Sequence, residues 1–129
     1  MRILVSGHHG YIGSVLAPLL AEAGHEVTGL DLDLYAGCDF GPELGDVPSL
    51  RLDVRNTPGE ALAGFDAIVH LAALSNDPLG DLNEEWTYDV NRDGTLALAR
   101  AAREAGVRRF VFASSCSMYG ASGTDHALD

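Results

Sequence analysis

The sequence of 129 residues predicts an α/β fold built on a doubly wound parallel sheet. Three features carry this prediction. Short apolar runs alternate with stretches of helical periodicity, which is typical of parallel strands joined by crossover helices. The first apolar run leads into a glycine-rich turn, and the second ends in an aspartate. We therefore expect one Rossmann-type domain over residues 1–129.

The first βαβ unit is expected within the first 31 residues. An apolar run predicts a strand over residues 2–6, and apolar positions at helical spacing predict a helix over residues 12–23. Gly24 supplies a C-terminal stop, and Pro18 removes one intrahelical hydrogen bond and so predicts a bend. Residues 25–31 read as the second strand, which completes the unit with a right-handed crossover.

The turn after the first strand carries three glycines, Gly7, Gly10 and Gly13. They allow a tight turn, a close approach of an anion to the backbone, and close packing of helix on strand. The helix N-terminus directs unpaired N–H groups towards the same point. Because the chain has a net charge of −11 and no basic run, an anionic cofactor must be held mainly by backbone amides. This predicts a pyrophosphate site.

Asp31 ends the second strand 18 positions after Gly13, close to the spacing at which a carboxylate meets an adenosine ribose. A carboxylate there accepts hydrogen bonds from ribose hydroxyls and repels a 2′-phosphate, so NAD is favoured over NADP. Asp33 is the local rival, although it lies further past the strand. The alternative interpretation of Asp31 is a polar residue that only ends a strand.

The middle of the chain predicts two further strands. Residues 35–48 read as an excursion over the surface, residues 50–55 as the third strand, and residues 57–62 as a short helix. Asp53 could accept a hydrogen bond from an adenine amino group, although a solvated loop aspartate is the better interpretation of this residue alone. The fourth strand is expected over residues 65–73.

The fourth strand ends in two small residues, Ala72 and Ala73. They would let a cofactor lie against the backbone where strand order reverses. Within the same strand, His70 is interpreted as a hydrogen-bonded core histidine. The longest helical stretch follows over residues 84–105, and Gly94 inside it predicts a close packing partner. Residues 109–113 read as the fifth strand, which runs into a serine-rich segment.

Composition excludes several classes of partner and location. An acidic chain without a basic run argues against nucleic acids and anionic membranes, and no window is long and apolar enough for a membrane span. Cys38 and Cys116 are far apart and indicate neither a disulfide framework nor a zinc site, so a reducing cytoplasm is expected. His8 and His9 are expected to face solvent or donate near phosphate. A metal pair is not expected without a carboxylate partner.

Taken together, these segments resemble the N-terminal portion of an extended short-chain dehydrogenase/reductase, the NAD-dependent nucleotide-sugar epimerase/dehydratase family. The matching segments occur in family order across nearly the whole chain: Ser6–Ser14, Gly24–Val27, Asp31, Asp53–Val54, His70–Ala73, Val90–Thr95 and Phe112–Gly120.

The resemblance implies NAD as the cofactor and assigns its contacts by position. The implied contacts are Gly7, Gly10, Tyr11, Ile12 and Gly13 for pyrophosphate, Asp31 for ribose, Asp53 and Val54 for adenine, Leu71, Ala72, Ala73 and Ser75 along the cofactor, and Val90 and Asn91 towards the nicotinamide. The active-site hydroxyl matches Ser115, with Ser114 as the neighbouring candidate. Its implied role is a hydrogen bond to the sugar oxygen that gains or loses hydride.

The sequence departs from the family at its catalytic base, a tyrosine in a Tyr-x-x-x-Lys pair, because it contains no lysine. Tyr119 belongs to the strand-end motif and is not expected to take that role. The chain also stops before the family's next helix, later strands and substrate domain. We therefore expect a sheet truncated after the fifth strand, with that strand as an exposed edge.

The expected function is the NAD-binding portion of an epimerase or dehydratase that acts on a nucleotide-diphosphate sugar, inactive as an isolated chain. The helix over residues 84–105 matches one that the family uses to form homodimers, so a homodimer is a further expectation. Two alternatives stay open: a non-catalytic dinucleotide-binding module or subunit, and an NADP-dependent reductase of small carbonyl compounds.

Overall fold

The computed structural model describes residues 1–38, 47–75 and 83–115. Its centre is a five-stranded parallel sheet in the order β3-β2-β1-β4-β5, which confirms the predicted fold class. The strands are β1 (Arg2–Ser6), β2 (Glu26–Asp31), β3 (Ser49–Arg51), β4 (Ala67–His70) and β5 (Arg109–Phe112). From β1 the chain adds β2 and β3 on one side and then returns to add β4 and β5 on the other side of β1, as a doubly wound sheet requires.

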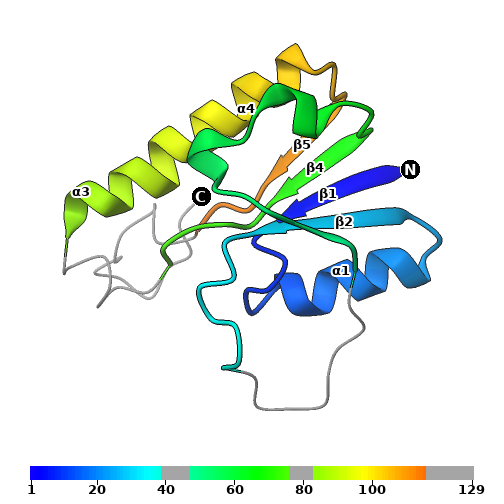
Figure 1. Ribbon diagram of the computed structural model, residues 1–129, viewed down its shortest axis with the longest axis horizontal. Helices are drawn as coiled ribbons and strands as arrows, with labels where there is room; N and C mark the ends of the chain where they lie inside the picture. Colours follow the sequence, from blue (N-terminus) through cyan, green and yellow to red (C-terminus); the bar gives the residue numbers. More distant parts are fainter. Residues whose placement is uncertain (39–46, 76–82, 116–129) are drawn as a thin grey trace, which may run out of the picture.

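Helices cover both faces of this sheet (Figure 1). Helix α1 (Gly13–Glu22) lies on one face, and the helical stretch made of α3 (Glu84–Thr87), η3 (Tyr88–Gly94) and α4 (Thr95–Glu104) lies on the other. Successive residues of β1 serve opposite faces, as the alternation of a strand demands. Leu4 belongs to the core under α4, whereas Ile3 and Val5 belong to the core under α1.

The sequence predicts the third strand over residues 50–55, but β3 ends at Arg51, so the prediction is wrong for the residues after it. The chain turns there into η1 (Val54–Asn56), a 3₁₀ turn that Asp53 caps by accepting the Arg55 N–H at 2.9 Å. A side chain that offers the backbone its own acceptor competes with extension of the strand. The short helix expected next is also a 3₁₀ turn, η2 (Gly59–Leu62). Strands β4 and β5 are shorter than expected and end at His70 and Phe112.

The long helix is present, but its middle is a π-helical segment of seven residues, η3. Such segments occur often at functional sites. Gly94 closes this segment and packs tightly, because a Cβ atom there would lie 3.1 Å from the Arg55 Cγ and 3.3 Å from the Val54 Cγ2. The packing partner predicted for Gly94 is therefore η1.

Strand β5 forms one edge of the sheet, and Val111 and Phe112 on it are about half exposed, as expected. Among the described residues, no helix has the length and apolar character needed to cross a membrane.

Candidate functional site

Because the strands are parallel, their carboxyl ends meet at one edge of the sheet. The residues that end β1, β2, β4 and β5 there are Ser6, Asp31, His70 and Phe112. Ligands of open α/β sheets bind in the crevice outside this edge, where strand order reverses. The candidate site therefore lies between the segments that follow β1 and β4.

The glycine turn fits closely against the segment that follows β4. Gly7 has a φ of +76°, and a Cβ atom there would lie 2.7 Å from the backbone N and 2.8 Å from the Cα of Ala72. A Cβ on Gly13 would overlap the Gly7 carbonyl oxygen and the His8 backbone. Any side chain at either position would push the turn out of place. The structure thus brings Gly7 into close contact with Ala72 and with Gly13.

Helix α1 begins at this turn without a side-chain cap and without an acidic residue in its first turn. In this turn the Ser14 N–H donates to the Gly10 carbonyl at 2.9 Å and the Val15 N–H donates to the Ile12 carbonyl at 3.2 Å, so the helix offers an anion the positive end of its dipole rather than these two amides. Tyr11 and Ile12 beside it are exposed and help to line an open hollow along α1.

Asp31 holds the glycine turn through one carboxylate oxygen and the segment after β2 through the other. The His9 N–H donates to Oδ2 at 3.1 Å, and the Asp33 N–H donates to Oδ1 at 3.0 Å. A carboxylate has about four lone-pair sites, so about half remain for ribose hydroxyls. The rival Asp33 is engaged elsewhere, because its Oδ1 lies 2.7 Å from the His9 Nδ1 and its Oδ2 lies 3.8 Å from the Arg51 Nε.

His8 does not face solvent, so the first of the two alternatives expected for the histidine pair, exposure to solvent, is wrong for this residue. Its side chain is 2% exposed and lies in the space that Gly29 of β2 leaves open. A Cβ atom at Gly29 would overlap the imidazole ring. Glycine at a strand interior marks a close approach of another group, which is the signal that could have revealed this contact.

Asp53 is bound to its own neighbour. Its carboxylate accepts bonds from the Arg55 Nε at 3.0 Å and Nη2 at 2.6 Å, and the side-chain hydrogen bonds from Arg55 hold its pKa below the ordinary value. Arg55 also pairs with Asp89. Asp53 is thus a capping residue in an ion pair rather than a solvated aspartate, and an adenine amino group would share this carboxylate. The Val54 side chain lies in the core.

His70 is the hydrogen-bonded core histidine that the sequence predicts. Its Nδ1 lies 2.6 Å from the Ser6 Oγ, and its Nε2 lies 2.8 Å from the Thr95 Oγ1. Since the Thr95 hydroxyl donates to the Asn91 carbonyl at 2.6 Å, it accepts from His70, which assigns the proton to Nε2. Burial lowers the pKa of His70 to about 4, so the ring is neutral at pH 7.

Asn91 fixes the loop that follows β4. Its side-chain amide donates to the Leu74 carbonyl at 2.9 Å, and its side-chain oxygen accepts the Leu74 N–H at 2.8 Å. Leu74 lies between the predicted cofactor contacts Ala73 and Ser75. The Asn91 side chain therefore binds the loop that follows β4. Val90 beside it is partly buried.

The serines follow β5 at the same edge. The Ala113 N–H donates to the His70 carbonyl at 3.1 Å, which keeps this segment beside the end of β4. Ser114 and Ser115 come next and are exposed. The rest of the serine-rich motif, with Cys116 and Tyr119, lies outside the described residues.

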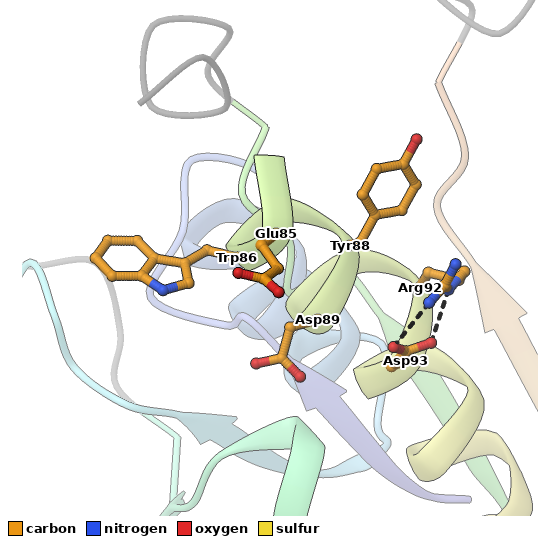
Figure 2. Close-up of a pocket in the computed structure, with 6 residues that line it drawn as sticks. All are labelled: Glu85, Trp86, Tyr88, Asp89, Arg92 and Asp93. Carbon is orange, nitrogen blue, oxygen red and sulfur yellow. Dashed lines mark hydrogen bonds and ion pairs between the residues drawn. The ribbon is translucent and has the colours of Figure 1, made fainter. Parts of the chain in front are cut away.

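A separate hollow lies on the helix formed by α3 and η3. Figure 2 shows Trp86 and Tyr88 extending on opposite sides of this helix. Arg92 pairs with Asp93, with 2.7 Å between the Arg92 Nε and the Asp93 Oδ1. The lining residues are Glu85, Trp86, Tyr88, Asp89, Arg92 and Asp93. None of them is a predicted cofactor contact.

Comparisons with known proteins agree with this geometry. The model of the NAD dependent epimerase/dehydratase family matches residues 3–128. A UDP-glucose 4-epimerase from Streptomyces lividans is 38% identical over 126 residues, covering 92% of this chain and 37% of that protein. A 3-beta-hydroxysteroid dehydrogenase from Mycolicibacterium neoaurum is 37% identical over 125 residues, covering 91% of this chain and 32% of that protein.

Among solved structures, the UDP-glucose-4-epimerase from Stenotrophomonas maltophila, with bound NAD and formylated UDP-arabinopyranose, superposes with a TM-score of 0.83. It is 29% identical, and the match covers 98% of this chain and 40% of that one. The chain thus spans about a third of the length of the two curated relatives, at 37% and 32%.

Proposed function

The chain belongs to the NAD dependent epimerase/dehydratase family, and from this premise we propose that it binds NAD at the carboxyl edge of its sheet. The close fit of Gly7 against the Ala72 backbone carries the proposal, because a turn without side chains there lets a pyrophosphate approach the backbone beside the start of α1. Asp31 would accept ribose hydroxyls, and the two backbone N–H groups that hold its carboxylate support this role.

We propose that the other predicted contacts lie along the same bound cofactor. The implied pyrophosphate contacts are Gly7, Gly10, Tyr11, Ile12 and Gly13, and those further along the cofactor are Asp53, Val54, Leu71, Ala72, Ala73, Ser75, Val90 and Asn91. The clamp between Asn91 and Leu74 supports this path, because it fixes the loop that carries Ala73 and Ser75.

We propose a nucleotide-diphosphate sugar as the substrate of the reaction to which this chain contributes. When bound, NAD supplies the hydride acceptor for a sugar carbinol. Ser115, with Ser114 as its neighbour, would hydrogen-bond the sugar oxygen and orient it. The epimerase relatives support a sugar nucleotide, whereas the steroid dehydrogenase relative favours oxidation of another alcohol as the second candidate.

We further propose a homodimer formed through the helix of α3, η3 and α4. Trp86, Tyr88 and Leu96 on this helix are 63%, 57% and 45% exposed, and aromatic residues are enriched at protein interfaces. The exposed thiol of Cys38 suits a reducing compartment, and we place the protein in the cytoplasm.

Calorimetric titration with NAD and with NADP tests the cofactor proposal. We expect NAD to bind more tightly. Asp31→Asn should weaken NAD binding by roughly tenfold or more, since a hydrogen bond to a charged group contributes about 1.5–3 kcal/mol. Glu22→Gln, which removes an exposed carboxylate at the far end of α1, is the matched control and should bind NAD normally. Tighter binding of NADP would overturn the role of Asp31.

A further inference from the structure

Three side chains with metal-ligating atoms meet where the glycine turn passes the end of β2. They are His8, His9 and Asp31, and each offers one ligand atom, with all three atoms within 4.8 Å of one another. The turn brings the two imidazoles together, since their ring centroids are 3.8 Å apart. The carboxylate partner that a histidine pair needs is therefore present.

The polar atoms of His8 are the independent sign of a ligand. The side chain is 2% exposed, yet neither ring nitrogen has a hydrogen-bond partner among the residues described. The Leu30 carbonyl accepts the Gly7 N–H at 2.8 Å and makes no well-formed bond with the ring. The Nδ1 atom lies 4.0 Å from the Asp31 Oδ2, which is too far for a hydrogen bond. Buried polar groups without partners are rare in native proteins and call for a cause.

The ligand atoms that these three side chains offer indicate which kind of ion would bind there. Two imidazole nitrogens with one carboxylate oxygen are typical of Zn²⁺ and other borderline divalent ions, whereas Mg²⁺ and Ca²⁺ prefer oxygen alone. Burial is the main cause that lowers the pKa of His8 below its ordinary value, which favours the neutral ring that metal ions bind.

We propose that His8, His9 and Asp31 form a binding site for a divalent transition-metal ion, with Zn²⁺ as the reference ion. In a tetrahedral zinc site, ligand atoms lie roughly 3.3 Å apart, given bonds of about 2.0–2.1 Å. The three atoms must therefore approach one another by at most about 1.5 Å from their present limit of 4.8 Å. The His9 side chain is 46% exposed and would give up the contact of its Nδ1 with Asp33 to reach the metal, and water would complete the fourth position.

The site shares Asp31 with the ribose site, and this consequence rests on the proposed binding of NAD. One carboxylate cannot serve a metal ion and the ribose hydroxyls together at full strength. Metal and NAD should therefore weaken each other's binding, by the same factor in both directions, because linkage is reciprocal.

Titration of the untagged, chelator-treated chain with ZnCl₂ tests the site. We expect one equivalent of Zn²⁺ to bind, and His9→Ala and Asp31→Asn each to weaken this binding at least tenfold. His25→Ala and Cys38→Ser, which remove a histidine and a thiol outside the cluster, should bind Zn²⁺ as the unmodified chain does. Circular dichroism verifies that each variant is folded.

Absence of saturable binding, equal binding of Mg²⁺, or equal loss in the two control variants would overturn the site. A repeat of the NAD titration with saturating Zn²⁺ separates the two proposals. We expect Zn²⁺ to weaken NAD binding to the unmodified chain. Zn²⁺ binding without any effect on NAD would refute the competition and leave the site standing. Failure of the metal-free chain to bind NAD would refute the proposed function alone.

Discussion

His8 and His70 are two buried histidines at the same edge of the sheet, and they differ in what their ring nitrogens do. Their exposed fractions are 2% and 1%, and burial lowers the pKa of both. His70 has a hydroxyl partner at each nitrogen, from Ser6 and Thr95, whereas His8 has none among the described residues.

The difference separates a structural histidine from one placed for a ligand. The partners of His70 come from β1 and α4, and Thr95 passes the chain of hydrogen bonds to Asn91, which holds the loop at Leu74. His70 therefore joins three elements that the fold itself supplies. His8 is held by packing in the space above Gly29 and against the His9 ring, and its ring nitrogens, without a hydrogen-bond partner among the described residues, are left for a group that binds.

The largest expected effect is a loss of stability in acid that depends on His70. Its pKa is about 4 in the folded chain and about 6.5 when unfolded, so the unfolded state binds the proton more readily between these values. The free energy of unfolding should therefore fall as pH drops from 6.5 to 4, by about 3 kcal/mol at 1.36 kcal/mol per pKa unit, and this loss should level off below pH 4.

Urea unfolding at pH 7.5, 6, 5 and 4.5 measures this slope. His70→Asn should be less stable at pH 7.5 and should show a shallower decline, because the group that titrates is gone. His25→Ala removes a histidine outside the core and should keep the full decline. If His70→Asn and the unmodified chain lose stability in parallel, the assigned role of His70 is wrong.

A second, smaller effect concerns the space that holds His8. Gly29→Ala places a methyl group where the imidazole lies, and overpacking of this kind costs about 1–3 kcal/mol. The free energy of unfolding should fall accordingly. In the double variant with His8→Ala, most of this cost should disappear, because the methyl group then has room.

Gly24→Ala is the contrasting control for Gly29→Ala. Gly24 has a φ of +84° but no atom within 4 Å of its hypothetical Cβ, so its cost comes from the backbone alone. The His8→Ala change should not reduce that cost. Equal rescue of both glycine variants would show that His8 and Gly29 are not coupled through contact.

The two histidines also show where sequence reasoning succeeds and where it stops. The apolar run around His70 predicts its burial, because periodicity is a local property, and the same local patterns predict β1, β2 and α1 to within about two residues. The burial of His8 depends on Gly29, 21 positions away on β2. A glycine inside a strand signals the close approach of some group, but no local pattern identifies His8 as that group.

Local competition explains the other errors. Residues 50–55 alternate as a strand would, yet Asp53 caps a 3₁₀ turn and ends the strand at Arg51. Helical periodicity over residues 84–105 predicts the helix but not its π-helical segment, because the apolar pattern does not reveal which carbonyl each backbone N–H bonds to. The glycine turn and Asp31 could be predicted as one site, because their spacing follows from the βαβ unit.

The smallest expected effect tests one hydrogen bond of the His70 network. Thr95→Val keeps the shape of the side chain but removes the hydroxyl that accepts the Nε2–H, so a buried donor is left without a partner at a cost of about 1–2 kcal/mol. Thr95→Ser keeps the hydroxyl and should lose less stability, through its missing methyl group alone.

Because the Thr95 hydroxyl also donates to the Asn91 carbonyl, the loop at Leu74 should exchange its amide hydrogens faster in Thr95→Val. Hydrogen exchange measured at Leu74 distinguishes a network from isolated bonds: unchanged exchange together with lower stability would mean that His70 and the loop are held independently.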